Sequence, residues 1–138
     1  MPIHTTNYTN TFIEVAEDCP AAQAEIPSFK GDKKTIARLQ FEMVYDHPYK
    51  YTSDEVIFHC FAVKNDVSKS EMEDAKREFF SKGQACMRAS ALTKRYGFGV
   101  HFNEEGKMAI YPIESEEYQK FTADKNLKHL KAMRSKKG

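Results

Sequence analysis

The chain has 138 residues, of which 41% are hydrophobic and 30% charged, and its formal net charge is +1. The length is sufficient for one domain with a substantial core, and the composition excludes global disorder. The nearly neutral charge gives no overall field that would recruit nucleic acid or an anionic membrane. We expect a single domain over residues 1–138, with residues 135–138 as a frayed tail.

Location and redox state follow from what the sequence lacks. No apolar window is long enough to span a bilayer, and no basic region precedes an apolar stretch at the N-terminus. The three cysteines, Cys19, Cys60 and Cys86, show no C-x-x-C spacing. Free thiols in a reducing compartment are the simplest explanation, so the sequence predicts a cytoplasmic protein without membrane attachment.

The first half of the chain predicts a strand, a helix and a second strand. A strand is expected at Thr11–Ala16, and a helix over Lys34–Asp46 that ends before Pro48. Gln40 falls within the apolar arc of that helix and would need a buried partner. Val56–Val63 (VIFHCFAV) is apolar and rich in β-forming residues, which predicts a central strand covered on both faces.

Two helical segments are expected next. Ser68-x-x-Glu71 is a capping box, and the helix that it opens presents one apolar face made of Met72, Ala75, Phe79 and Phe80. Ser90 is placed to cap a helical turn at Ala91–Arg95, which Gly97 would stop.

A β-hairpin follows. Phe98–Phe102 and Lys107–Tyr111 are joined by the loop Asn103–Gly106, a pattern typical of two antiparallel strands. If all four loop residues lie outside the ladder, His101 faces Met108.

The chain is expected to end in helices. Ser115 opens a short one that presents Tyr118 and Phe121, and the spacing of Leu127, Leu130 and Met133 predicts a final, basic helix. The whole order predicts an α+β fold, with a mostly antiparallel sheet of about four strands and helices packed on it.

Long blocks of the sequence resemble a known family. They are HTTNYTNTFIEVAEDCPA, KTIARLQFEM, YKYTSDEV, FFSKGQACMRASALTKRYGFGVHF and LKHLKAMRSK. Together they are similar to a family of short uncharacterised bacterial proteins catalogued as a domain of unknown function. The resemblance implies a bacterial, cytoplasmic protein and brings no activity, cofactor or catalytic residue with it.

Metal and thiol chemistry find little support. His59 and His101 fall on predicted strands and could ligate a metal with Cys60, Cys86 or a carboxylate, but no H-x-H, H-x-x-x-H or H-E-x-x-H spacing exists. The alternative is a core histidine bonded to an internal acceptor. Cys86, near several basic residues, is the best candidate for a nucleophilic thiol, and idle packing is the alternative. We therefore assign no metal and no cofactor.

The segment KRYGFG, from Lys94 to Gly99, is the most informative for binding. Two bases, two aromatics and two glycines can form a surface that receives an anion. The alternative is a helix end with favourable bases, followed by a core strand.

Three functional hypotheses result. The first is a non-enzymatic binding module for a small anionic ligand or a protein partner, with the candidate residues Arg88, Lys94, Arg95, Tyr96 and His101. The second is a small enzyme in which His101 or His59 is the acid–base group and Arg88 or Arg95 holds an anionic substrate. The third is weak nucleic-acid binding through the basic C-terminal helix, which the lack of a recognised motif disfavours.

Overall fold

The computed structural model describes residues 5–27, 29–30 and 33–134, so the predicted tail at 135–138 lies outside the described residues. Its helices are α1 (Ile36–Tyr45), α2 (Ser53–Lys64), α3 (Met72–Phe79), α4 (Ala91–Lys94) and α5 (Glu116–Ala123), with 3-10 turns η1 (Lys69–Glu71) and η2 (Met87–Ala89). Its strands are β1 (Thr11–Glu14), β2 (Phe29–Lys30), β3 (Lys33–Lys34), β4 (Phe98–Phe102), β5 (Met108–Pro112) and β6 (Lys128–Lys131).

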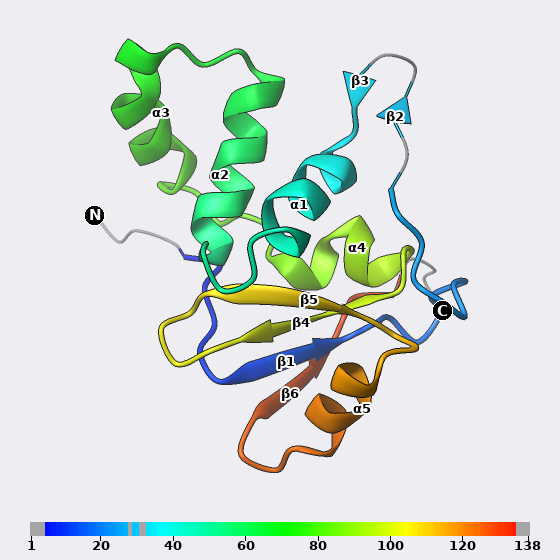
Figure 1. The fold of residues 1–138 in the computed structure, drawn as a ribbon. Coiled ribbons are helices and arrows are strands. Elements are labelled where there is room, and N and C mark those ends of the chain that lie inside the picture. Colours follow the sequence, from blue (N-terminus) through cyan, green and yellow to red (C-terminus); the bar gives the residue numbers. More distant parts are fainter. Residues whose placement is uncertain (1–4, 28, 31–32, 135–138) are drawn as a thin grey trace.

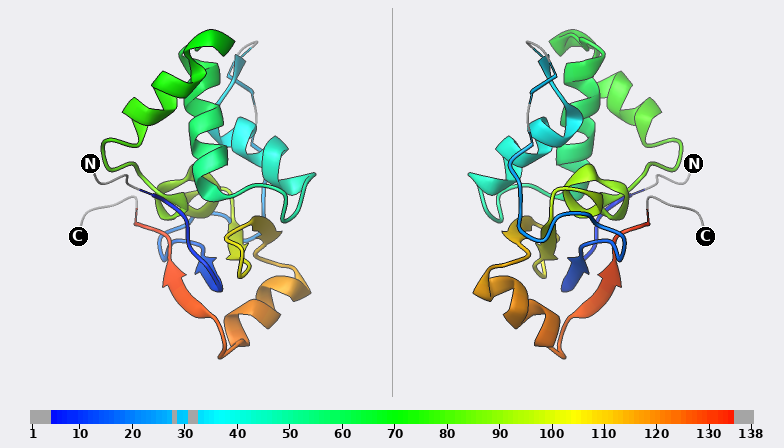
Figure 2. Two further views of the ribbon diagram at one scale, coloured as in Figure 1. Left: turned by 90° about the vertical axis from the view of Figure 1, so that its left-hand side faces the viewer. Right: turned by 90° about the vertical axis from the view of Figure 1, so that its right-hand side faces the viewer.

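Four strands form the main sheet, in the order β5-β4-β1-β6. The β5–β4 and β4–β1 pairs are antiparallel, whereas β1 and β6 are parallel. Helices α1, α2 and α4 lie on one face of this sheet and α5 lies on the other, while α3 packs against α2 (Figures 1 and 2). The predicted α+β fold with a mostly antiparallel four-stranded sheet is confirmed.

Alternation along β4 assigns its side chains to the two faces. Phe98, Val100 and Phe102 point toward α1, α2 and α4 and belong to the main core. Gly99 and His101 point toward α5, because successive residues of a strand face opposite sides.

In the described part of the chain, no helix has the length and apolar composition that a membrane span requires.

The predicted central strand at Val56–Val63 is wrong, because these residues form most of α2. Thr52 and Glu55 make a complete capping box, in which each side chain bonds the other's backbone N–H, and this starts a helix. The helix is apolar on more than one side because it packs between two clusters: Val56 contributes to the main core and Phe58 to a smaller core with α3.

The predicted C-terminal helix is also wrong. Lys128–Lys131 is strand β6, which pairs Ile13 of β1 with Leu130. The Lys128 N–H donates to the Asn10 carbonyl at 2.9 Å, so the edge of β1 supplies the bonds that a helix would have made internally. The basic helical face that nucleic-acid binding would use is therefore not formed.

The hairpin is confirmed, with a register one residue away from the prediction. His101 pairs with Ala109, and Phe102 pairs with Met108. The reason is a shorter loop: the Asn103 N–H donates to the Lys107 carbonyl at 3.0 Å, and Gly106 takes a left-handed φ of 81°. His101 therefore shares a face with Ala109 and not with Met108.

Candidate functional site

Gln40 is the polar side chain that helix α1 carries into the interior. Thr35 caps the helix by accepting the Arg38 N–H at 3.1 Å, which fixes the start of α1 and the face on which Gln40 lies. Gln40 is only 6% exposed, and its Oε1 accepts a hydrogen bond from Ser90 Oγ at 2.5 Å. The buried partner expected for Gln40 is thus found fifty residues along the chain.

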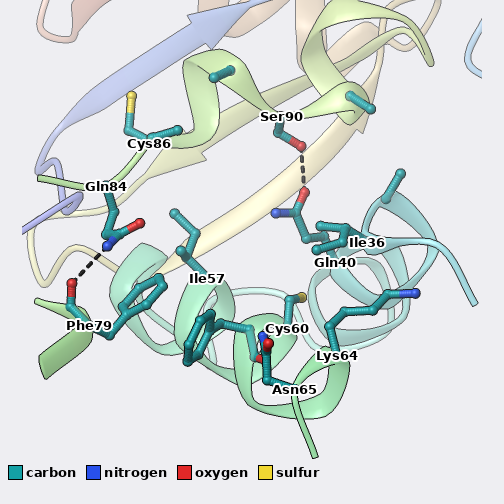
Figure 3. Close-up of a pocket in the computed structure, with 15 residues that line it drawn as sticks. Ile36, Gln40, Ile57, Cys60, Lys64, Asn65, Phe79, Gln84, Cys86 and Ser90 are labelled. Carbon is teal, nitrogen blue, oxygen red and sulfur yellow. Dashed lines mark hydrogen bonds between the residues drawn. The ribbon is translucent and has the colours of Figure 1, made fainter. Parts of the chain in front are cut away.

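Ser90 determines how the amide of Gln40 is oriented. Ser90 Oγ accepts the Leu92 N–H at 3.1 Å as the cap of α4, so its own hydrogen needs an acceptor. Gln40 Oε1 fills that role, which turns Nε2 in the opposite direction. Nε2 has no hydrogen-bond partner among the described residues, and Figure 3 shows it pointing toward Ile57.

The space that Gln40 Nε2 faces is an open cleft of about 450 Å³ between α1, α2 and the segment 84–91. We call it the Gln40 cleft. Its apolar lining includes Ile36, Ile57, Phe61 and Phe79, and its polar lining includes Gln40, Lys64, Asn65, Gln84 and Ser90. Apolar walls with a few placed polar groups are typical of small-molecule sites.

Two further groups limit the chemistry of the cleft. Gln84 is anchored, because its Nε2 donates to the Phe79 carbonyl at 2.7 Å. Burial raises the pKa of the Cys60 thiol to about 12, while the ammonium of Lys64 acts in the opposite direction. Cys60 is therefore a thiol at neutral pH and supplies no nucleophile.

A second group of functional side chains lies on the other face of the sheet. Tyr49 Oη is 2.8 Å from His101 Nδ1 and 2.9 Å from Tyr111 Oη, and both contacts are hydrogen bonds. The His101 ring stacks on Phe121 of α5, with centroids 4.2 Å apart and planes at 17°. These four residues form what we call the His101 cluster.

Burial disfavours the charged forms of two groups in the His101 cluster. Burial lowers the pKa of His101, and the carboxylate of Asp124 partly offsets this. Burial raises the pKa of Tyr49, and its bond to Tyr111 adds to the effect. Tyr49 also has a positive φ of 61°, and its N–H donates to the Met108 carbonyl at 2.7 Å, which holds the phenol over the sheet. His101 Nε2 has no hydrogen-bond partner in the described ranges.

The other predicted binding residues do not join His101. Arg88 lies beside the end of β6, where its Nε donates to the Lys131 carbonyl at 2.7 Å. Lys94 and Arg95 are at the end of α4, and Tyr96 packs against the main core. The sheet lies between these residues and the His101 ring, which faces α5.

Thiols and metal-ligating groups are dispersed. All three cysteines are free, and Cys86 Sγ lies 3.3 Å from Tyr8 Oη. Burial raises the pKa of Tyr8 to about 12, and its hydrogen bond to Cys86 adds to the effect. Among the residues that the structure describes, no group of three or more His, Cys, Asp or Glu side chains is arranged to hold a metal ion.

The residues of the Gln40 cleft were mostly missed by sequence reasoning. Ile57 and Phe61 line it because Val56–Val63 is helical, so their assignment to a strand hid their common face. The capping box of Thr52 and Glu55 was the available signal for that helix. Ser90 was recognised only as a cap, although it also orients Gln40.

Comparison with known proteins gives a family without an assigned activity. No curated protein and no solved structure matches the chain. A family model covers residues 3–138, which is nearly the whole sequence. The chain belongs to a family of unknown function, DUF6157.

Proposed function

We propose that the chain is a non-enzymatic binding module that takes a small organic ligand into the Gln40 cleft. The observation that carries the proposal is the Nε2 of Gln40. This donor belongs to a residue that is only 6% exposed, and no described residue accepts a hydrogen bond from it. Nε2 faces the open cleft, where water is its hydrogen-bond partner in the free protein. A ligand oxygen that accepts from Nε2 would take the place of that water.

The shape and lining of the cleft support the same function. Its volume of about 450 Å³ falls within the range of about 300–1,000 Å³ found for ligand pockets. The amide is held by Ser90, so little conformational entropy is lost when a ligand binds. Ala89, Ser90 and Ala91 bring part of the predicted Arg88–His101 region into the cleft wall.

A fragment screen followed by two-dimensional NMR tests this proposal. Fragments that bear a carbonyl or ether oxygen should shift the side-chain amide of Gln40 and the backbone amides of Ile57 and Ala89. Gln40→Glu keeps an oxygen for the Ser90 hydroxyl and replaces the donor that faces the cleft by an acceptor. It should weaken these fragments about tenfold.

Gln119→Glu is the matched control, because Gln119 is exposed on α5 across the sheet. It should leave fragment affinity unchanged. Fragments that shift only resonances outside the cleft, or that bind Gln40→Glu as well as the unmodified chain, would refute the proposed function.

A further inference from the structure

The charge of the Gln40 cleft indicates which ligands it favours. Lys64 is a charged residue of its lining, and no aspartate or glutamate is among the described residues that line it. Lys64 Nζ donates to the Lys34 carbonyl at 2.5 Å, and none of the described carboxylates pairs with it. The cleft therefore presents one positive charge that no ion pair neutralises.

Lys64 is exposed, and its ammonium only partly offsets the larger effect of burial on the pKa of the Cys60 thiol. In Figure 3 Lys64, Ile36 and Gln40 lie on one side of the cleft, and Phe79 and Gln84 lie on the other. The Lys64 ammonium points away from the Gln40 amide in this view, and it bonds to the Lys34 carbonyl, so the Lys64 side chain must turn to bring the cation and the amide donor to one ligand.

We infer that the ligand is a monocarboxylic acid with an apolar body, an inference that rests on the proposed function. The carboxylate has two acceptor oxygens and no donor, so it can accept from Gln40 Nε2 and from Lys64 Nζ together. The long flexible side chain of Lys64 allows its ammonium to leave the Lys34 carbonyl for this purpose. The body of the acid lies against Ile57, Phe61 and Phe79.

Other classes of ligand fit less well. An ammonium group would meet the positive charge of Lys64 with no carboxylate in the described lining to accept it. A phosphate dianion would bring two negative charges against one lysine and an apolar wall, at a high desolvation cost. A neutral amide would use Gln40 but gain nothing from Lys64.

Three probes of matched shape separate these classes: 4-phenylbutyrate, 4-phenylbutyramide and 4-phenylbutylamine, titrated and followed by two-dimensional NMR. The butyrate should bind in the cleft about fivefold or more tightly than the amide, with the amine weakest. Lys64→Gln should bring the butyrate to the affinity of the amide. Lys120→Gln, an exposed lysine of α5 on the far face of the sheet, should preserve the difference.

The outcomes distinguish this inference from the proposed function. If butyrate and amide bind equally well in the cleft, or the amine binds best, the carboxylate class is wrong and the binding function stands. If the butyrate shifts no resonance of the cleft, the class is also wrong, and the fragment screen with Gln40→Glu still decides the function. A butyrate preference that survives Lys64→Gln would overturn the role of Lys64.

Discussion

Gln40 and Tyr49 lie on opposite faces of one sheet, and the hydrogen bonds of their polar atoms differ. The Tyr49 hydroxyl has two protein partners within 2.9 Å, His101 and Tyr111. The Gln40 amide has one partner, Ser90, and a donor left over in a cavity. The Tyr49 hydroxyl is bonded to protein groups on both sides, whereas His101 Nε2 and Gln40 Nε2 have no described hydrogen-bond partner, and of these two atoms Gln40 Nε2 faces the cleft. This comparison is the reason that we propose the helical face for binding.

Packing also differs between the two faces, and truncation of one phenylalanine on each should show it. Phe102 is completely buried beneath α1 and α2, so Phe102→Ala should lower the free energy of unfolding by about 3–5 kcal/mol. Phe121 is only half-buried under the His101 ring, so Phe121→Ala should cost less than half as much. Urea denaturation measures both values, and equal costs would show that α5 is as much a part of the core as α1.

Gly99 gives a sharper test of the α5 face. A Cβ at this position would lie 2.6 Å from Phe12 Cζ and 2.6 Å from Tyr118 Cε2, closer than packed atoms allow. Gly99→Ala should therefore destabilise the protein by about 1–3 kcal/mol through overpacking. Hydrogen exchange should rise in α5 and stay unchanged at Gln40 and Ala89. An equal increase on both faces would contradict their independence.

The His101 cluster should make stability depend on pH, and the Gln40 cleft should not. Burial lowers the folded-state pKa of His101 below its ordinary value of 6.5, so the unfolded chain binds the proton more readily. The stability due to neutral His101 is then fully present above about pH 6.5 and is lost as the pH falls through the lowered pKa.

His101→Gln provides the measurement. The difference in free energy of unfolding between the unmodified chain and this variant should shrink from about pH 7.5 to about pH 5. The groups that act on His101 are Tyr49, Tyr111 and Asp124, and His129 lies on the same face of the sheet, where β6 pairs with β1. A difference that grows as the pH falls would mean that the fold favours the protonated ring.

The last prediction compares how fast a reagent modifies the two thiols of the Gln40 cleft, and it involves no change in stability. Cys60 is 1% exposed and burial raises its pKa to about 12, whereas Cys86 is partly exposed. In the native protein a thiol reagent should modify Cys86 about tenfold faster than Cys60. Mass spectrometry of the labelled peptides gives both rates. Equal rates would show that the floor of the cleft opens readily to solvent.

Local patterns predicted most of the fold because the relevant signals are local. The cap of Ser90, the hairpin on either side of Gly106 and the helix opened by Ser115 each depend on a few neighbouring residues. The need of Gln40 for a partner also followed from its place on α1, and Ser90 meets it.

The two wrong assignments depended on distant contacts. Val56–Val63 is apolar on more than one side because two separate cores cover it, and such a pattern resembles that of a central strand. Leu127, Leu130 and Met133 have helical spacing. In the described sheet, however, one edge of β1 is paired by this segment, which is therefore a strand. The cleft was missed for the same reason, since its walls come from α1, α2 and the segment 84–91.

The parallel pairing of β1 with β6 has a consequence for how the chain folds. Thr11 pairs with Lys128, so one side of β1 stays open until residues 128–131 have left the ribosome. Contacts between such distant residues close a long loop and slow folding. Until then β1 is an exposed edge that can pair with a strand of another chain. We therefore expect that during synthesis aggregation competes with the pairing of β6, and that a chain shortened before Lys128 would keep this edge of β1 open.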